Sequence, residues 1–338
     1  MFRKENLPLR YEFEAIHNKD YSVVKTLGSS IVLNGGHFFL LSSSLFSTFV
    51  DMKKHFPSLS LPLVICRMMV LMCVLTICDS ALAQSVKVVS YNIRLSAAAK
   101  ADGDNCWERR RYGSLTMVRR EQPDIIGLQE ALPDQVDYLC DSLHGYAFVG
   151  VGRDDGQRQG EHMGVLYNTR RFRLLRQHTW WLSATPDSVS YGWDAACRRT
   201  VTYVLLRERK TGRQLAYLNT HLDHRGEQAR QEAVLLLCRL IEEYVPQGVP
   251  VVLGGDMNSD STDSIFLPLA QHHLLSARNI ARQTDMQATF HNWGKAATVI
   301  DHFYVRGITP DTFQVLTADY GVPFLSDHYP IAITFTLR

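Results

Sequence analysis

The sequence predicts an α/β fold, a four-layer sandwich in which two mostly antiparallel β-sheets pack together and carry helices on their outer faces. Two observations in residues 84–338 favour this class. Strand-like segments outnumber helical ones, and several neighbouring strands are separated by short turns typical of hairpins. A doubly wound parallel sheet would instead need a helix between nearly all successive strands.

The first half of this region combines predicted strands with two predicted helices. Apolar residues recur at helical spacing from Trp107 to Gln122, where Pro123 stops the pattern, and Pro133 opens a second helix that runs to about Leu143. The segment 152–162 is rich in Gly, Asp, Arg and Gln, which predicts an exposed, mobile loop. The predicted strands are 86–93, 124–129, 146–151 and 163–167.

The second half is mostly strand and contains one long helix. Residues 226–244 have the strongest helical pattern, with Ala233, Leu236 and Leu240 on one apolar face. Thr211-Gly212 supplies a turn between two strand-like runs. The predicted strands are 173–182, 201–207, 214–220, 250–254, 300–305, 312–317 and 331–337.

The composition is that of a globular protein. The chain has 338 residues, of which 46% are hydrophobic and 21% charged, so it can bury a sizeable core. It contains no fixed-period repeat and no long low-complexity stretch, which argues against a solenoid or a disordered chain.

The N-terminal quarter carries a predicted signal peptide. The unbroken apolar run 68–78 (MMVLMCVLTIC) follows the basic residues Lys53 and Lys54 and precedes the small-residue segment 81–83 (ALA), which is typical of a secretory signal. The run is shorter than the roughly 20 residues of a membrane-spanning helix. We expect cleavage after Ala83 and a secreted or periplasmic protein; an uncleaved membrane anchor is the alternative.

The residues before this signal are hard to reconcile with export, because secretory signals stand at the start of a protein. The segment 52–55 (MKKH) looks like an ordinary signal-peptide beginning. Our hypothesis is that translation starts at Met52 and that 1–51 is an over-extended gene start or a disordered extension. Residues 52–83 are then the signal peptide, and 84–338 form a single domain.

The charge balance of this domain limits its partners. Of the 36 Lys and Arg and the 34 Asp and Glu residues, 1–83 hold 8 and 6, which leaves 28 of each sign and no net charge in 84–338. Proteins that grip long nucleic acid usually carry a basic excess. Arginine groups at 109–111, 170–176 and 198–199 still leave room for a local basic rim.

The cysteines are not expected to bind metal. Four remain in the domain without any CxxC pair, and export permits disulfides between them, whose state the sequence leaves open. Cys140 and Cys238 fall within apolar helical patterns, which predicts buried free thiols. The four are Cys106, Cys140, Cys197 and Cys238.

Polar side chains gather at the ends of the predicted strands. One alone would be an ordinary turn or cap residue. Six such positions in one domain instead predict a shared polar pocket. They are Asn92, Glu130, His221, Asp256 with Asn258, and Asp301, with the pair Asp327-His328 just before the last strand.

These residue types suit the hydrolysis of phosphate esters. The anionic oxygens of a phosphate ester repel nucleophiles, so catalysis needs positive charge and a positioned water. The oxygens of Asn92, Glu130 and Asp327 suit Mg²⁺ or Mn²⁺. A histidine with a carboxylate partner can act as a base or stabilise the transition state.

Six segments together resemble the endonuclease/exonuclease/phosphatase family, also called DNase I-like. They occur in the family's order and cover nearly all of 84–338. SDHYPI and GDMN are each moderately specific for the family, and all six segments in this order are highly specific for it. The loop 152–164 and the segment GWDAA (192–196) are similar to secreted bacterial members distantly related to the carbon-catabolite-repressor deadenylases. The six segments are SYNIR (90–94), PDIIGLQEA (123–131), LNTHLDH (218–224), LGGDMNSD (253–260), VIDHFYV (299–305) and SDHYPI (326–331).

The resemblance implies a metal site and its ligands. Glu130 matches the family's principal metal-ligand glutamate, and Asn92 matches the asparagine beside it. Asp327 matches a carboxylate on the metal side. The implied cofactor is Mg²⁺ or Mn²⁺, and one or two ions remain open.

The resemblance also implies the catalytic residues. His221 matches the first catalytic histidine, which contacts the scissile phosphate, and Asn258 matches the asparagine that orients the phosphate. Asp256 matches the aspartate that handles the nucleophile or the leaving group. His328 matches the second histidine, and Asp301 matches its carboxylate partner.

Four further residues are candidates for contact with substrate. Arg153 lies in the predicted mobile loop, where it would meet a phosphate, and Glu161 in the same loop is a candidate partner for His221. Trp193 and Arg198 come from a Gly- and Asp-rich segment. Trp180 and Trp181 fit core packing better.

The expected function is hydrolysis of a phosphodiester, as a 3'-5' exonuclease or an endonuclease. The scarcity of lysine and the zero net charge favour a small or single-stranded substrate over duplex DNA. One alternative is a phosphatase or phosphodiesterase acting on a small sugar phosphate, inositol phosphate or phospholipid head group. Another is a binding protein without turnover. We expect a monomer that needs no protein partner.

A metallo-β-lactamase-type hydrolase is a weaker alternative. It is suggested by His221-Leu222-Asp223-His224, but such sites need a further histidine pair just upstream. Asn219 and Thr220 stand there instead.

Overall fold

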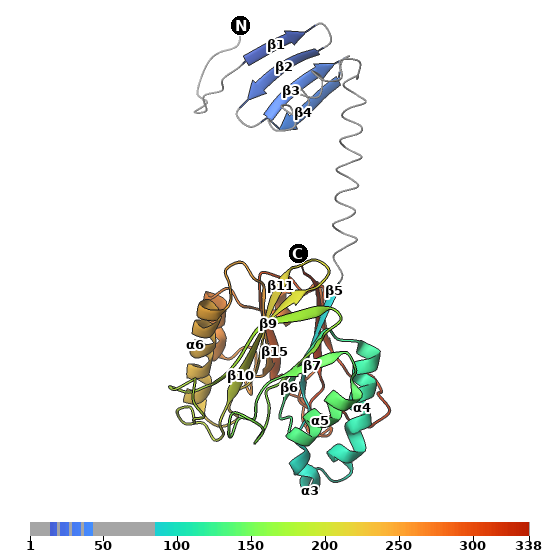
Figure 1. Cartoon of the computed structure of the whole chain (residues 1–338), viewed down its shortest axis with the longest axis vertical. Helices are drawn as coiled ribbons and strands as arrows, with labels where there is room; N and C mark the ends of the chain where they lie inside the picture. Colours follow the sequence, from blue (N-terminus) through green and yellow to red (C-terminus); the bar gives the residue numbers. More distant parts are fainter. Residues whose placement is uncertain (1–13, 19–20, 27–28, 35–36, 43–84, 338) are drawn as a thin grey trace. The chain divides into compact units, whose positions relative to one another are not determined.

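The computed structural model describes residues 14–18, 21–26, 29–34, 37–42 and 85–337, which fall into two units, 1–81 and 82–338 (Figure 1). The described strands of the first unit form an antiparallel sheet in the order β1-β2-β3-β4. The predicted signal peptide lies outside the described residues, and the predicted start at Met52 stays a prediction. The strands are β1 (Glu14–Asn18), β2 (Tyr21–Thr26), β3 (Ser29–Asn34) and β4 (His37–Ser42).

The second unit contains a seven-stranded sheet in the order β14-β16-β17-β5-β6-β8-β7. Its central pair, β5 and β6, is parallel, as is the edge pair β14 and β16, and the other pairs are antiparallel. The strands are β5 (Ser85–Asn92), β6 (Ile125–Gln129), β7 (Tyr146–Val149), β8 (Val165–Asn168), β14 (Gln283–Thr284), β16 (Thr312–Val315) and β17 (Ile331–Thr336).

The same unit contains a six-stranded sheet in the order β13-β15-β12-β11-β10-β9. Only β11 and β12 run parallel in it. Helix α6 connects these two strands, as a parallel crossover requires. The strands are β9 (Phe172–Trp181), β10 (Thr200–Glu208), β11 (Gln214–His221), β12 (Val251–Asp256), β13 (Leu275–Ser276) and β15 (Asp301–Arg306).

Helices cover the outer face of each sheet, which confirms the predicted four layers (Figure 1). Pro133 begins α5, and α4 ends before Gln122, which is left-handed at φ 47° and followed by Pro123. The helices are α3 (Ala99–Asp102), α4 (Trp107–Glu121), α5 (Pro133–Ser142), α6 (Glu227–Tyr244), α7 (Leu267–Gln271) and α8 (Ala277–Ile280), with short 3₁₀ turns η1 (Ser96–Ala98), η2 (Gly103–Asn105) and η3 (Ser264–Phe266).

Three apolar layers hold the unit together. One fills the space between the two sheets and includes Val88, Tyr217 and Phe303. A second packs α6 on the six-stranded sheet, and a third packs α4 and α5 on the seven-stranded sheet. Burial of apolar surface on both faces of a sheet stabilises it strongly and holds the ends of its strands in place.

Most of the predicted elements are present, with boundaries shifted by one to three residues. Trp180 and Trp181 are buried, as predicted, whereas Cys140 is exposed because it lies on the outer face of α5. The expectation of an exposed loop at 152–162 was wrong in part. The loop folds back on itself, and the side chains of Arg153 and Glu161 are each only 12% exposed. Among the described residues, no helix has the length and hydropathy of a membrane span.

Candidate active site

The six-stranded sheet places three of the predicted catalytic residues side by side. His221 ends β11 and is in register with Asp256 at the end of β12, which is in register with Asp301 at the start of β15. β11 and β12 run parallel and end at this edge of the sheet, and the antiparallel strand β15 begins there. Three adjacent strands therefore present an imidazole and two carboxylates at one edge.

The seven-stranded sheet brings the predicted metal ligands to the same edge. Asn92 ends β5, and Glu130 directly follows β6, which runs parallel to β5. The Asn92 amide donates to Glu130 Oε1 at 3.0 Å and to Asp256 Oδ2 at 3.0 Å. This amide joins the two sheets, so the site is assembled when the sheets pack.

Asp256 lies at the centre of the cluster. Its Oδ2 lies 3.4 Å from His221 Nε2 and 3.7 Å from His328 Nε2, and its Oδ1 accepts from the Asn258 backbone N–H at 3.0 Å. The side chain is almost fully buried, and burial raises the pKa of the Asp256 carboxyl above its ordinary value, although His328 opposes this rise. Asp256 can therefore accept or release a proton near neutral pH.

His328 is held by Asp301. The two side chains approach to 2.9 Å between His328 Nδ1 and Asp301 Oδ2, and both are buried. Burial alone would lower the pKa of His328, but the carboxylates of Asp301 and Asp256 outweigh it and the pKa is raised. The predicted His328–Asp301 pair is thus present, with Nε2 directed toward Asp256.

His221 has the opposite electrostatic environment. Burial lowers its pKa well below the ordinary value, and the positive charges of Arg199 and Arg153 lower it further. Asn258 Nδ2 donates to the Leu222 carbonyl and to His221 Nε2, both at 3.0 Å, so Nε2 is an acceptor. The neutral ring then carries its proton on Nδ1, which has no hydrogen-bond partner among the described residues.

The predicted metal ligands provide a donor set that fits a hard divalent cation. Glu130 and Asp327 supply carboxylate oxygens. Asn92 lies beside them with its amide nitrogen toward Glu130, and its Oδ1 accepts from the Arg94 backbone N–H at 3.0 Å. The guanidinium of Arg94 lies 4.0 Å from Glu130 Oε2 and 3.8 Å from Asp327 Oδ2. Two carboxylates that converge on one cation provide the charge that Mg²⁺ or Mn²⁺ needs. Asp256, Asp301 and His328 form a second group, whose possible ligand atoms lie within 4.8 Å of one another.

Three residues of this site have strained backbone conformations. Arg94, Glu130 and Asn258 have φ values of 57°, 63° and 47°, a region that residues other than glycine seldom adopt. Such conformations persist only where the surrounding structure imposes them, and they are frequent in functional sites.

The loop 152–162 and Arg198 together carry charges of both signs; we call the four residues Arg153, Asp154, Glu161 and Arg198 the wall. Arg153 pairs with Glu161 at 2.7 Å, and Arg198 pairs with Asp154 at 3.2 Å. The predicted pairing of Glu161 with His221 was wrong, because the guanidinium of Arg153 captures the Glu161 carboxylate. Burial raises the pKa of Glu161 to about 7, although Arg153 opposes the rise, and the charge of Glu130 adds to it.

Trp193 stays a substrate candidate without further support. It is half-buried and makes no hydrogen bond or ring contact in the part of the chain that the structure describes. Its neighbour Tyr191 is 55% exposed and lies under the Arg198 guanidinium, 4.5 Å from the ring centroid.

Sequence reasoning did not single out two arginines: Arg94, which lies in the site, and Arg199, whose charge lowers the pKa of His221. Arg94 donates to Asp102 at 3.1 and 3.3 Å while it faces the metal ligands. Arg199 is buried, bonds Asp223 at 3.2 Å and contacts His224 at 2.9 Å. Arg94 lies within the SYNIR segment, but no sequence signal separates Arg199 from an ordinary surface arginine.

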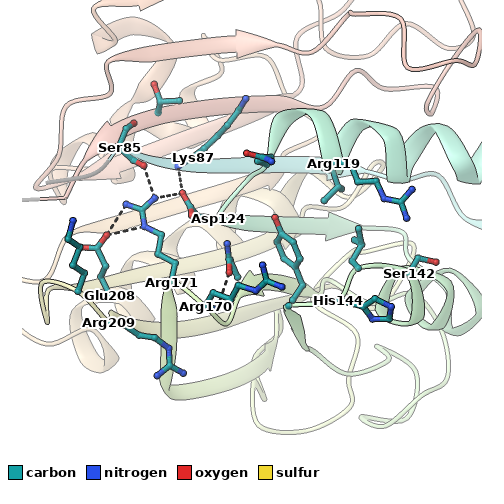
Figure 2. Close-up of a pocket in the computed structure, with 18 residues that line it drawn as sticks. Ser85, Lys87, Arg119, Asp124, Ser142, His144, Arg170, Arg171, Glu208 and Arg209 are labelled. Carbon is teal, nitrogen blue, oxygen red and sulfur yellow. Dashed lines mark hydrogen bonds and ion pairs between the residues drawn. The ribbon is translucent and has the colours of Figure 1, made fainter. Parts of the chain in front are cut away.

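Two other features lie outside this site. Ligand atoms of Cys197, Asp223 and His224 cluster within 4.8 Å, but the Asp223 oxygens already accept from Arg199 and from the backbone N–H groups of Cys197, Arg225 and Gly226. The expectation that the cysteines bind no metal stays a prediction. A cavity of about 1110 Å³ lies where β5 begins, at the other end of that strand from Asn92 (Figure 2).

The fold and the site define a class of enzyme that hydrolyses phosphoric esters. The family model described as the endonuclease/exonuclease/phosphatase family matches residues 89–328. The chain belongs to this family and is a phosphoric ester hydrolase.

Three similar proteins show how far the likeness extends. The structure of a family member from Bacteroides vulgatus is 30% identical in sequence, with a TM-score of 0.71. The match covers 75% of this chain and 100% of that chain. The mannosyl-6-phosphatase of Bacteroides thetaiotaomicron is 31% identical, with a TM-score of 0.69, over 74% of this chain and 99% of that one. An uncharacterized protein of Acanthamoeba polyphaga mimivirus is 24% identical over 273 residues, 74% of this chain and all of its own.

Proposed function

We propose that the protein is a divalent-metal-dependent phosphatase of a small, hydroxyl-rich phosphate ester such as a phosphorylated sugar. One observation carries the hydrolytic part of this proposal. Glu130, Asn92, Asp256, His328 and Asp301 form an unbroken series of contacts, with hydrogen bonds of 2.9 to 3.0 Å and one separation of 3.7 Å. A metal ligand and a His–carboxylate pair therefore belong to one connected cluster.

The residues divide the chemistry between them. A divalent ion held by Glu130, Asn92 and Asp327 would polarise the phosphate and offset negative charge. His328, kept cationic by Asp301, stabilises negative charge on the phosphoryl group as it develops. Asp256, whose pKa burial raises, is placed to take the proton from an attacking water.

His221 supplies a directed donor. Its Nδ1–H is buried without a partner among the described residues, and an unsatisfied buried donor costs about 1–3 kcal/mol. A phosphate oxygen that accepts from Nδ1 removes this cost only when substrate is bound. Asn258 fixes the tautomer that makes this possible.

The mixed charge of the wall supports the sugar part of the proposal. Arg153, Glu161, Asp154 and Arg198 offer both donors and acceptors, which suits hydroxyl groups. A tract built for a nucleic-acid backbone would instead be uniformly basic. The similarity to a mannosyl-6-phosphatase at 31% identity points the same way.

Cleavage of a phosphodiester is the second candidate, and one observation favours it. The guanidinium of the half-buried Arg198 stacks on the exposed ring of Tyr191, and such a pair can stack on a nucleobase. A single-stranded nucleic acid is the corresponding substrate. We further propose that the enzyme is secreted or periplasmic, and that it acts as a monomer without an obligate protein partner.

Hydrolysis of a matched substrate panel tests the function. The panel contains sugar 6-phosphates, a synthetic phosphodiester and a single-stranded oligonucleotide, each with Mg²⁺, Mn²⁺ or EDTA. We expect the highest kcat/KM on a sugar 6-phosphate, with EDTA abolishing it. His328→Ala should lower kcat by about 10²–10⁴-fold. His144→Ala is the matched control, because His144 is exposed and lies at the other end of the strands.

The panel separates the candidates. A higher kcat/KM on the oligonucleotide or the diester would replace the phosphatase by the phosphodiester candidate. Turnover that survives both EDTA and His328→Ala would contradict the proposed site. Tight binding of every phosphate without turnover would indicate a binding protein.

A further inference from the structure

The cavity at the beginning of β5 has a basic lining. It measures about 1110 Å³ and is bordered by the beginning of β5, the end of β10 and the loops after α5 and β8 (Figure 2). The candidate active site uses the other end of β5, at Asn92, so roughly 20 Å of strand separates the two. None of the predicted site residues lines this cavity.

At the floor of the cavity, buried charged residues are paired with one another. Arg171 binds Asp124 at 2.6 Å and Glu208 at 2.8 Å, and it donates to the Ser85 carbonyl at 2.7 Å, as Figure 2 shows. Both acidic residues of the lining are thus engaged with Arg171, and Lys87 is paired with Glu121 from outside the lining.

Four cations stand around this floor without an ion pair in the part of the chain that the structure describes. Arg119 comes from the last turn of α4, Arg170 from the turn after β8, and Arg209 and Lys210 from the turn after β10. We call these four residues the rim cations. All are exposed, and the one side-chain bond among them joins Arg209 Nε to the Thr169 carbonyl at 2.8 Å.

This concentration of positive charge does not follow from composition. Residues 84–338 have no net charge, yet the cavity is lined by six Lys and Arg residues and two acids. Three separate elements contribute the rim cations to one concave surface. Like charges repel, so the arrangement costs free energy unless anions occupy it.

We propose that the basic cavity binds a linear polymer that carries phosphate groups. A single exposed ion pair contributes at most about 1 kcal/mol, so one free phosphate gains little from any one of the rim cations. A polymer that contacts several of the rim cations gains free energy from each contact. It loses its translational entropy only once, when the first contact forms. The positions of the rim cations, on three separate elements around one cavity, favour this multivalent ligand.

The site would hold the enzyme on phosphate-rich material while the catalytic cleft stays free. The two sites lie at opposite ends of β5, so occupancy of one leaves the other accessible. The proposal goes beyond the proposed function, because binding at the cavity requires no turnover.

Binding of inorganic polyphosphate to the purified protein tests the proposal. The test variant is Arg119→Gln/Arg170→Gln/Lys210→Gln. The matched control is Arg173→Gln/Arg176→Gln/Arg239→Gln, which removes the same charge from exposed positions outside the cavity. We expect the Kd of the test variant to rise by about tenfold or more, and that of the control to change by less than about twofold. Added salt should weaken wild-type binding.

Further arms separate the sources of the anion. We expect orthophosphate at equal total phosphate not to compete. Vesicles of phosphatidylglycerol should bind more weakly than the polymer. Equal weakening by both triple variants, or full competition by orthophosphate, would overturn the proposal. Binding to vesicles without binding to polyphosphate would also overturn it. Hydrolysis of a small phosphomonoester should be unchanged in both variants, so loss of binding is distinguishable from failure of the proposed function.

Discussion

At the scale of single residues, burial and neighbouring charge give two histidines opposite states around one carboxylate. His221 and His328 both approach Asp256 Oδ2. The carboxylate of Asp301 raises the pKa of His328, whereas burial and Arg199 lower that of His221. One ring is therefore a cation that stabilises negative charge, and the other is a neutral donor. This division of labour depends on partners that lie far away in the sequence.

Asp301→Asn tests that division. The amide keeps the size of the side chain but removes the charge that holds His328 cationic, so we expect kcat to fall by about 10²–10³-fold with little change in KM. Steady-state kinetics on the preferred substrate measures this. Asp311→Asn, a substitution of a carboxylate outside the cleft, serves as the control. A kcat within twofold of wild type would remove His328 from the chemistry.

Asp223 makes folding stability depend on pH. Burial raises its pKa, but hydrogen bonds from the Gly226 and Arg225 backbone and the charge of Arg199 outweigh this, and the pKa is lowered. A lowered pKa in the folded state means that this stabilisation is complete above about pH 4, the unfolded value, and is lost as pH falls further. Urea unfolding of Asp223→Asn should show a loss of about 1–3 kcal/mol at pH 7 that shrinks toward pH 3. A loss independent of pH would contradict this.

At the scale of elements, hydrophobic periodicity predicted nearly every long strand and helix, because each buries one face or both. The two-residue strands β13 and β14 were missed, since two residues carry no period. The loop 152–162 was expected to be exposed because of its polar composition. Arg153 and Glu161 are nevertheless largely buried and form an ion pair with each other, which composition does not reveal.

The two sheets approach each other closely at Gly127. A Cβ added to Gly127 on β6 would lie 2.0 Å from the Tyr217 hydroxyl on β11 and 2.5 Å from Asn219 Oδ1. We expect Gly127→Ala to destabilise the fold by about 1–3 kcal/mol, because a packed interior has no room to relax. Chemical denaturation measures this.

A companion variant shows whether the Tyr217 hydroxyl is the obstacle. That hydroxyl is buried without a partner among the described residues, so Tyr217→Phe should be neutral or stabilising by up to about 1 kcal/mol. Gly127→Ala should then cost less in the Tyr217→Phe background than in the wild type. Equal costs in both backgrounds would mean that the backbone, and not the hydroxyl, resists the methyl group.

At the scale of the whole molecule, the site exists only because two sheets pack. The sequence predicted that polar residues lie at the ends of the strands and that they share one pocket. The link from Asn92 to Asp256 and the place of Arg94 were not, because contacts between sheets depend on packing that no local pattern encodes. The same holds for the rim cations, which three separate elements bring together.

Bound metal should stabilise the fold. Glu130 and Asp327 flank Arg94, which balances only part of their charge, so a divalent ion gains affinity from both. At a concentration of 100 times Kd, such an ion adds about 2.7 kcal/mol, which is roughly 5–10 °C in Tm for a domain of this size. Thermal unfolding with Mg²⁺, with EDTA and with NaCl of equal ionic strength measures this. Glu130→Gln should abolish most of the shift, and an unchanged shift in that variant would place the ion elsewhere.

Export should leave this architecture intact, because the proposed cut precedes its first strand. β5 begins at Ser85 and lies at the centre of its sheet, paired with β6 and β17. Cleavage after Ala83 keeps all of these pairings, whereas a cut within β5 would remove the strand that carries Asn92. We therefore expect the exported protein to begin at Gln84, as measured by intact mass and N-terminal sequencing. A mature chain that retains 68–78 would instead indicate a membrane anchor, and any peptide from 1–51 in the precursor would contradict a start at Met52.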